Sequence, residues 1–438
     1  MTDATPDVSP DVSPHPAHTP STPTPADGGF DSDNRQAATI ADSARDYLNR
    51  LRGGDMGSLP AILGLIFLFV VFASLNDRFL TTYNMANLLV QAGSICVMAM
   101  GIVFVLLLGE IDLSAGVAGG ACATITALML IDYDWTWWAA TLAGIAVGAV
   151  IGLAIGSLVS FLGIPSFVVT LAFFLALQAV PLKLIGSGGS LRFNDEVLRG
   201  LSIKNVPIVA GWIAAGLIVL GFAALSLWRY RSLKARGLVH QPLGLVIIKI
   251  VVLAAIVLGV TALLSANRAP NPALFTIAGI PWVLPVVVAL LLFWTFILTK
   301  TRFGRHLYAV GGNAEAARRA GINVRRIRIM AFVICSSMAA ISGLLLASYV
   351  GKVSPGSGGG NVLLYAVGAA VIGGTSLFGG RGRAIDGVIG GLVIATIPNG
   401  LGLLNQASYI NFLVTGGVLL LAASVDAISR RRRSSAGV

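Results

Sequence analysis

The feature that most constrains this chain is a series of apolar segments, each long enough, or nearly so, for the roughly 20 residues that a helix needs to cross a bilayer. Charged residues make up only 11% of the 438 residues, against roughly 25% in soluble domains, and hydrophobic residues make up 56%. A backbone within lipid must satisfy its own hydrogen bonds, so each segment is expected to be helical. The segments lie near 58–75, 88–108, 116–131, 137–162, 166–185, 206–228, 243–265, 279–299, 329–350, 362–378, 385–404 and 409–428. The sequence therefore predicts an all-α polytopic membrane protein with between about ten and twelve transmembrane segments, twelve being preferred.

The net charge of +11 is spread unevenly along the chain. If the N-terminus is cytoplasmic and the segments alternate in direction, most of the Lys and Arg residues fall on the cytoplasmic side. This distribution follows the positive-inside rule, and it predicts that both termini are cytoplasmic. Because membrane orientation accounts for the basic excess, no nucleic-acid partner is expected.

The two ends of the chain differ in composition from the transmembrane domain expected at 58–428. Residues 1–34 are rich in Pro, Ser, Thr and Asp and carry hardly any large apolar residue, which predicts a disordered cytoplasmic tail. Residues 38–53 place apolar side chains at helical spacing with arginines on the other face. They form either an amphipathic helix on the membrane surface or a lead-in to the first span. Residues 429–438 are expected to form a basic cytoplasmic tail.

Several enzyme classes lack their sequence signatures here. The chain has no GxxxxGK[ST] phosphate loop, no nucleophile elbow and no zinc-protease motif. Cys96, Cys122 and Cys335 lie in apolar segments and are expected to be packing residues, and no His or Cys spacing suits a metal. We therefore expect no catalytic residue, no metal and no cofactor on this chain, and transport is the function class that remains.

The stretch VFVLLLGEIDLSAGVAGGACA carries Glu110 and Asp112 within an apolar run, with Ser114 just beyond them. An ionised carboxylate deep in lipid costs on the order of 3 kcal/mol even on lenient scales, so both side chains should face protein or water. The neighbouring glycines predict a broken helix that lines a cavity. Asp112 either caps the helix that follows, or lines the translocation path, or does both.

Two glycine-rich loops on the external side complete the pattern. Residues 186–205 form either a docking surface for an external partner or a plain connector, and residues 351–361 suit a moving rim. A weak internal repeat relates LGEIDLSAG, which starts at Leu108, to IGGTSLFGG, which starts at Ile372. Three matching residues are near chance, although internal repeats are common in transporters.

The loop at 300–328, hereafter the coupling loop, contains a short helix signature. Asn313 is suited to cap it and Gly321 to end it, while Glu315 lies in the first turn, where the helix dipole favours a negative charge. The small side chains of Ala316 and Ala317 predict that this helix docks closely against another surface.

This loop also carries a family resemblance. EAARRAG at 315–321 is similar to the EAA motif by which permeases of ABC transporters contact their ATPase subunit. Four motifs of the same family occur in order along the chain: GEIDLSAG, the extended loop motif TRFGRHLYAVGGNAEAARRAGINV, GGTSLFGGRG and PNGLGLL. Across 58–428 the chain resembles the permeases of monosaccharide ABC importers of the ribose/xylose class. An additional pair of spans at about 206–265 favours the xylose-type subgroup. The chain departs from the family where Glu110 replaces a common glycine, and where LLYAVGA at 363–369 replaces an acidic stretch.

The resemblance implies a permease that pairs as a homodimer around one path for a xylose-like monosaccharide. It also implies two partners, a cytoplasmic ATPase that holds ATP and Mg²⁺ and an extracytoplasmic sugar-binding protein. The residues expected in the path are Glu110, Asp112, Ser114, Thr375, Ser376 and Asn399. The residues expected to contact the ATPase are Asn313, Glu315, Ala316, Ala317 and Gly321. The alternative is an ion-coupled secondary transporter that uses Glu110 or Asp112 as its coupling site.

Overall fold

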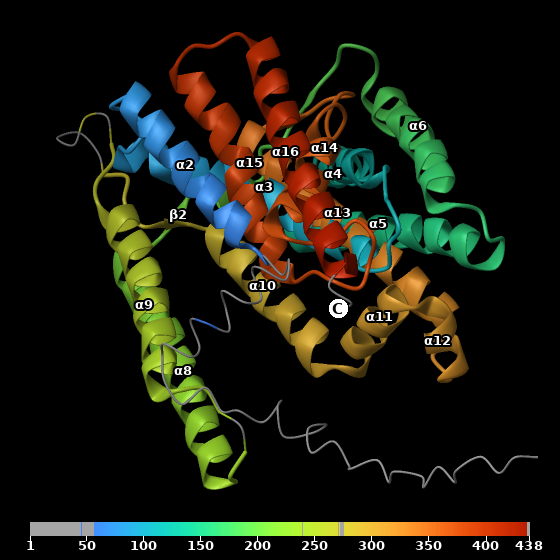
Figure 1. Ribbon diagram of the computed structural model, residues 1–438. Coiled ribbons are helices and arrows are strands. Elements are labelled where there is room, and N and C mark those ends of the chain that lie inside the picture. The colour runs from blue at the N-terminus through green and yellow to red at the C-terminus, as the bar shows by residue number, and fades with distance from the viewer. Residues whose placement is uncertain (1–44, 46–56, 239, 270, 272–275, 436–438) are drawn as a thin grey trace, which may run out of the picture.

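The computed structural model describes residues 45, 57–238, 240–269, 271 and 276–435. The tail expected at 1–34 lies outside these residues, as does the surface helix expected at 38–53 apart from Arg45. The structure is almost entirely helical (Figure 1).

Every predicted apolar segment contains a helix. These helices are α2 (Leu59–Leu75), α3 (Thr82–Leu106), α4 (Ala115–Ile131), α5 (Trp137–Phe161), α6 (Ser166–Ile185), α8 (Ile208–Ala235), α9 (Leu243–Ser265), α10 (Val283–Lys300), α13 (Val324–Val350), α14 (Val362–Gly373), α15 (Ala384–Leu403) and α16 (Ser408–Ser435). Among the described residues, eight helices are long and apolar enough to cross a bilayer. The shorter apolar helices are α2, α4, α14 and the first part of α16. The prediction of an all-α polytopic membrane protein is confirmed, and the exact number of twelve crossings stays a prediction.

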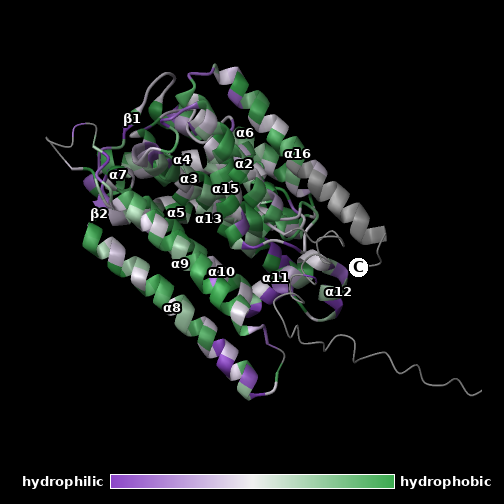
Figure 2. Cartoon of the chain, turned by 60° about the vertical axis from the view of Figure 1, so that its left-hand side comes forward, coloured by the Kyte–Doolittle hydropathy of each residue, from purple (hydrophilic) through white to green (hydrophobic). Residues whose placement is uncertain are grey.

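Three short helices and two small sheets join these segments. The helices are α7 (Glu196–Ile203), α11 (Arg302–Gly312) and α12 (Ala314–Arg319). Strand β1 (Leu191–Arg192) pairs antiparallel with β4 (Lys352–Val353), and β2 (Asn205–Val206) pairs antiparallel with β3 (Ile280–Pro281). We call the end of the molecule that carries α11 and α12 the α12 end, and the opposite end, which carries α7 and both sheets, the α7 end (Figure 2).

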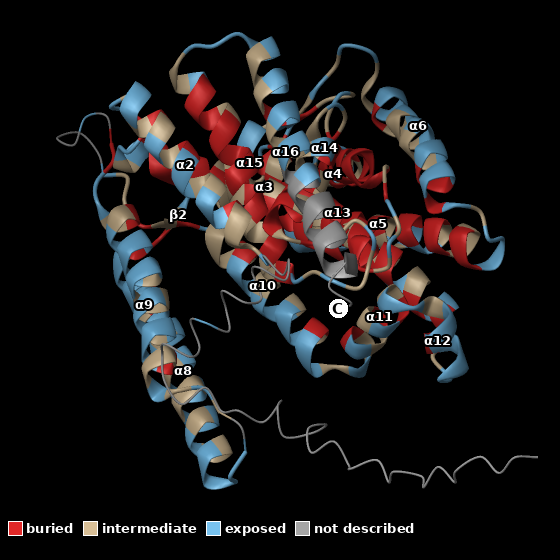
Figure 3. Cartoon of the chain, viewed as in Figure 1, coloured by how far each residue is buried: buried red, intermediate tan, exposed pale blue. Residues whose placement is uncertain are grey.

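The centre of the molecule is formed by α3, α13 and α15, whose residues are mostly buried (Figure 3). Small residues let backbones approach closely, which is how helices associate in lipid. On α5, a Cβ at Gly148 would lie 2.6 Å from the carbonyl oxygen of Ser336, and one at Gly156 would lie 2.8 Å from Cα of Ile329. Both neighbours belong to α13, so glycine on α5 sets the spacing of this helix pair.

Helices α8 and α9 stand beside this centre as a hairpin (Figure 1). Their surfaces are apolar and exposed (Figures 2 and 3). Exposed apolar side chains over the length of two helices suit a lipid environment. This hairpin corresponds to the additional pair of spans expected at 206–265.

The glycine-rich loop predicted to be an external rim instead lies against α4. A Cβ on Gly120 would overlap the carbonyl oxygen of Ser357, and a Cβ on Gly116 would lie 2.7 Å from the carbonyl oxygen of Gly358. Gly343 of α13 packs against α4 at the neighbouring residue, seven residues before α13 ends. That separation is about 10 Å along a helix. The loop therefore reaches roughly 10 Å below the α7 end of α13.

This unwound segment, residues 354–361, continues into α14, which has 12 residues. Such a helix is about 18 Å long, well short of the roughly 30 Å of a hydrocarbon core. The chain between α13 and α15 thus combines an unwound segment with half of a helix.

Candidate functional site

The break in the long apolar run around Glu110 lies where the sequence predicts it. Helix α3 ends at Leu106 and α4 begins at Ala115, and Gly109 between them has φ of +71°, which favours glycine. The residues 107–114 form a loop at the α12 end, which we call the first motif loop. It holds both carboxylates in irregular backbone, so neither is on a continuous helix.

Asp112 is almost fully buried, with 1% of its surface exposed. Its Oδ1 accepts hydrogen bonds from the Ser114 backbone N–H at 2.9 Å and from the Ser114 hydroxyl at 2.6 Å. Its Oδ2 has no hydrogen-bond partner of good geometry among the described residues, although the thiol of Cys335 on α13 is near the carboxylate. One oxygen therefore supports the start of α4, and the second is not fixed by a strong donor.

Glu110 points to a different partner. Its Oε1 lies 3.2 Å from Nε of Arg328, in the first turns of α13, and the two side chains are 15% and 32% exposed. The same loop is held on α6, where the Ile111 N–H donates to Ser166 Oγ and the Ile111 carbonyl accepts from Thr170 Oγ1, both at 3.3 Å. The first motif loop is thus fixed by α6 and by α13.

The second motif loop, residues 374–383, lies directly beside the first. The Gly380 N–H donates to the Leu107 carbonyl at 2.8 Å. Thr375 is buried, and no hydrogen-bond partner of its Oγ1 is found among the described residues. The Ser376 N–H donates to the Arg381 carbonyl at 2.9 Å, and Ser376 Oγ accepts from a backbone N–H within the loop. The structure therefore brings together Glu110, Asp112, Ser114, Thr375 and Ser376 on two adjoining loops.

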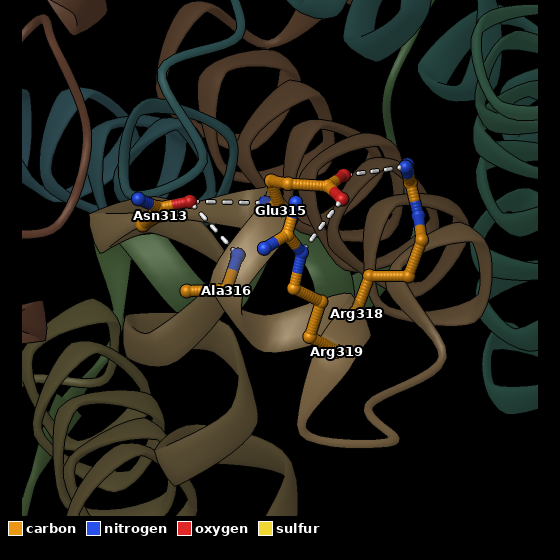
Figure 4. Close-up of polar contacts among 5 residues, drawn as sticks. All are labelled: Asn313, Glu315, Ala316, Arg318 and Arg319. Carbon is orange, nitrogen blue, oxygen red and sulfur yellow. Dashed lines mark hydrogen bonds and ion pairs between the residues drawn. The ribbon is translucent and has the colours of Figure 1, made fainter.

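The helix predicted in the coupling loop is present as α12 (Figure 4). Asn313 Oδ1 accepts from the backbone N–H groups of Glu315 and Ala316, at 3.1 and 2.9 Å. The Glu315 carboxylate pairs with Arg318 at 2.8 Å and with Arg319 at 3.3 Å (Figure 4). These ion pairs are exposed, and each adds at most about 1 kcal/mol to the stability of α12. The asparagine cap and the helix dipole therefore contribute more to forming this helix.

Two adjacent alanines of α12, Ala316 and Ala317, differ in exposure. Ala316 is exposed, whereas Ala317 is 5% exposed and packs in the main core. Gly321, which follows the helix, has φ of +81° and its N–H donates to the Arg318 carbonyl at 3.0 Å. Ala316 is thus a candidate contact for a partner, and Ala317 attaches α12 to the body of the protein.

Helix α11 is an element of the coupling loop that the sequence analysis did not separate from the rest of the loop. Phe303, Leu307 and Val310 recur at helical spacing, which was the available signal, and Leu307 and Val310 are buried. The hydroxyl of Tyr308 donates to the Gly382 carbonyl at 2.6 Å. Burial raises the pKa of Tyr308, and the charge of Asp386 raises this pKa further.

Helix α11 also touches both motif loops. A Cβ on Gly311 would overlap the Leu107 carbonyl oxygen and would lie 2.9 Å from the Gly380 nitrogen. No side chain larger than glycine fits between the coupling loop and these two loops without movement. The three motifs found separately in the sequence thus meet at one place.

Comparison with known proteins decides the family. Residues 84–423 match the model of a family described as the branched-chain amino acid transport system / permease component. The chain belongs to this permease family. It is 33% identical to the xylose transport system permease protein of Haemophilus influenzae over 379 residues, which cover 86% of this chain and 98% of that protein. It is 34% identical to the xylose transport system permease protein of Escherichia coli K12, over 85% of this chain and 92% of that protein.

The ribose import permease protein of E. coli K12 is 29% identical over 384 residues, or 88% of this chain and 97% of that protein. These matches confirm the resemblance to permeases of the ribose/xylose class. No solved structure matches the chain.

One predicted path residue of the permease lies away from the motif loops. Asn399 and Asn84 exchange two buried amide hydrogen bonds, at 3.0 and 3.1 Å, between α15 and α3. Asn399 is 15 residues beyond Ala384, where α15 begins, which is about 22 Å along the helix. Its place in the path stays a prediction, and its visible contact is a helix-to-helix amide pair.

The loop at 186–205 of the permease is folded against the α7 end. Arg199 Nη1 donates to the Ser348 carbonyl at 2.8 Å, which attaches α7 to α13. Beside it is a cavity of about 260 Å³. Its polar and aromatic lining residues are Asp134, Trp135, Arg192, Phe193, Asn194 and Asp195. This loop therefore presents a shaped, mixed-charge surface rather than an extended connector.

Proposed function

We propose that this permease is the transmembrane subunit of an ATP-driven importer of a pentose-type monosaccharide such as xylose. The main support is its identity of 33–34% with two xylose transport permeases, over at least 85% of this chain. Its own structural support is α12, a capped and exposed helix that extends from the helical body and suits docking to a second protein.

In this proposal the α12 end is cytoplasmic and the chain crosses the membrane twelve times. The described residues form eight apolar helices long enough to cross a bilayer and four shorter ones, twelve in all, which supports this count. The positive-inside rule then places the termini and the coupling loop in the cytoplasm. The protein resides in the bacterial cytoplasmic membrane in this arrangement.

Two partners and a second copy complete the transporter. A cytoplasmic ATPase binds ATP and Mg²⁺ and docks on α12 through Ala316 and the charged turn around Glu315. An extracytoplasmic binding protein delivers the sugar to the α7 end, where the folded loop at 186–205 and its cavity form part of the docking face. Two permeases form a homodimer around one path.

The sugar path passes along the unwound segment 354–361. Gly356 and Gly360 of this segment are exposed on the described chain, although the segment lies at membrane depth. Irregular backbone at that depth is stable only where protein covers it or where it lines a water-filled cavity. Unwound backbone beside a half-helix is also where transporters often bind their substrates. Sugar hydroxyls suit such backbone groups, because each donates and accepts hydrogen bonds.

Cysteine labelling tests this path. Gly356→Cys introduces a thiol where a Cβ meets no atom within 4 Å, and Lys352→Cys places a control thiol at the exposed α7 end. A small charged thiol reagent added outside should label both variants but block sugar uptake only in Gly356→Cys. If Gly356→Cys is unlabelled, or forms a disulfide with a second copy, the segment is a subunit contact and not the path.

Reconstitution tests the function as a whole. The permease is placed in vesicles with its ATPase and its binding protein, and xylose uptake is measured with ATP or with only a proton or sodium gradient. We expect uptake that requires both ATP and the binding protein. Uptake driven by a gradient without ATP, and lost in Glu110→Gln, would overturn the proposal in favour of ion coupling.

A further inference from the structure

We infer that Glu110 and Arg328 form a coupling latch, an ion pair through which movement of the coupling loop reaches the first motif loop. This inference rests on the proposed function, because it needs an ATPase that moves α12. Glu110 then acts as a positioning residue between the ATPase and the path and not as a residue that contacts sugar.

The position of Arg328 is the first observation. α12 ends at Arg319, and α13 begins at Val324 with the Asn323 side chain accepting from the Arg326 N–H at 3.0 Å. A turn formed by residues 320–323 and the first turn of α13 therefore separate the proposed docking helix from Arg328. Displacement of α12 is transmitted along this turn to the first residues of α13.

The ion pair of the Glu110 carboxylate is the second observation. Its pair with Arg328 spans 3.2 Å and is largely shielded, since Glu110 is 15% exposed. The Nε of Arg328 lacks the alignment of a hydrogen bond, so the contact is mainly electrostatic and does not depend on one angle. Such a contact keeps its attraction through small displacements, as a moving joint requires.

The surroundings make this pair the polar link between the coupling loop and the first motif loop. Among the described residues, other contacts of the coupling loop with the motif loops are the packing of Gly311 on Leu107 and Gly380, and the hydrogen bond from Tyr308 to Gly382, which lies in the second motif loop. The first of these only resists compression, because it is a close approach of backbone atoms. The Glu110–Arg328 pair is attractive, so it also transmits a pull on the loop that carries Asp112.

Charge exchange tests the latch in the complete transporter, with its ATPase and binding protein present. The variants are Glu110→Arg, Arg328→Glu and the double exchange, and the readout is the number of ATP molecules hydrolysed per sugar imported. Each single variant should raise this ratio about threefold to fivefold, the size expected for an ion pair whose arginine side chain is 32% exposed. The double exchange should bring the ratio back to near that of the unaltered protein.

Arg326→Glu is the matched control, because it makes the same change of charge at an exposed position two residues away. It should leave the ratio unchanged. Glu110→Gln keeps the shape of the side chain, so it reports loss of charge in a protein that is expected to fold. Membrane levels of all variants are measured in parallel.

Two results would overturn the latch. The single variants could keep the normal ratio, or the double exchange could fail to restore it at normal membrane levels. Neither result affects the proposed function, which fails only if the unaltered transporter shows no ATP-driven sugar uptake. The latch is therefore tested by the variants, and the proposed function is tested by the unaltered transporter in the same experiment.

Discussion

The close packing of the unwound segment on α4 makes Gly120 a sensitive position. An added Cβ would lie 2.6 Å from the carbonyl carbon of Ser357 and would overlap its oxygen. Ordinary contacts begin near 3.4 Å, so Gly120→Ala must push the segment or α4 by more than an ångström to clear that oxygen. The neighbour is backbone, and no rotamer change relieves the overlap.

The magnitude follows from two opposing effects. Overpacking typically costs about 1–3 kcal/mol, and a rigid backbone neighbour places this case near the upper value. Alanine is favoured over glycine inside a helix by about 1 kcal/mol, which offsets part of the cost. We therefore expect Gly120→Ala to lower the free energy of unfolding by about 2 kcal/mol and, for a chain of 438 residues, the apparent Tm by about 2 °C.

Gly216→Ala is the control, because Gly216 lies within α8 and a Cβ there meets no atom within 4 Å. It keeps the helix preference and removes the overlap, so it should leave the apparent Tm unchanged or slightly raised. Both variants are heated in detergent and the remaining folded protein is measured by size-exclusion chromatography. Equal apparent Tm values for the two variants would show that residues 354–361 do not pack on α4 as described.

Three further sets of substitutions probe the buried polar contacts and α12. Asp112→Ala leaves the N–H and the hydroxyl of Ser114 without their acceptor, and it should cost about 1–3 kcal/mol of stability in the same heating assay. Asp112→Asn keeps an acceptor, so it should retain the fold but lose sugar uptake. Asn84→Leu or Asn399→Leu alone leaves the other amide without its buried hydrogen-bond partner, at a similar cost in stability. The double substitution should cost less than the sum of the two single substitutions, which a double-mutant cycle of apparent stability measures. Ala317→Glu buries a charge and should reduce the amount of folded protein, whereas Ala316→Glu should fold normally and weaken co-purification of the ATPase.

The positions of the helices were predictable because lipid offers the backbone no hydrogen-bond partners. An apolar run must form its own hydrogen bonds, so the runs gave most helix boundaries to within a few residues. The break at Gly109 was predictable for a related reason, since carboxylates and glycines together oppose a continuous lipid-facing helix. The cap at Asn313 followed from local chemistry alone. These features depend on residues close in sequence.

The unwound segment was not predictable in the same way. A glycine-rich stretch between two apolar runs has the composition of an external loop, and only its contacts with Gly116 and Gly120 place it against α4. The difference between Ala316 and Ala317 likewise depends on how α12 sits against the body. The pairing of Asn399 with Asn84 joins residues 315 positions apart. Such features are set by tertiary packing, which no local pattern reports.

The two carboxylates of the first motif loop show how this distinction bears on mechanism. On a continuous helix Glu110 and Asp112 would point about 200° apart, and the broken helix separates them as well. Glu110 turns to Arg328 and the coupling loop, while Asp112 turns to the start of α4. A permease that moves in response to ATP needs both a link to its ATPase and a polar group near the path. The structure offers one carboxylate for each role, and Asp112, whose Oδ2 has no partner of good geometry among the described residues, is the better candidate for the path.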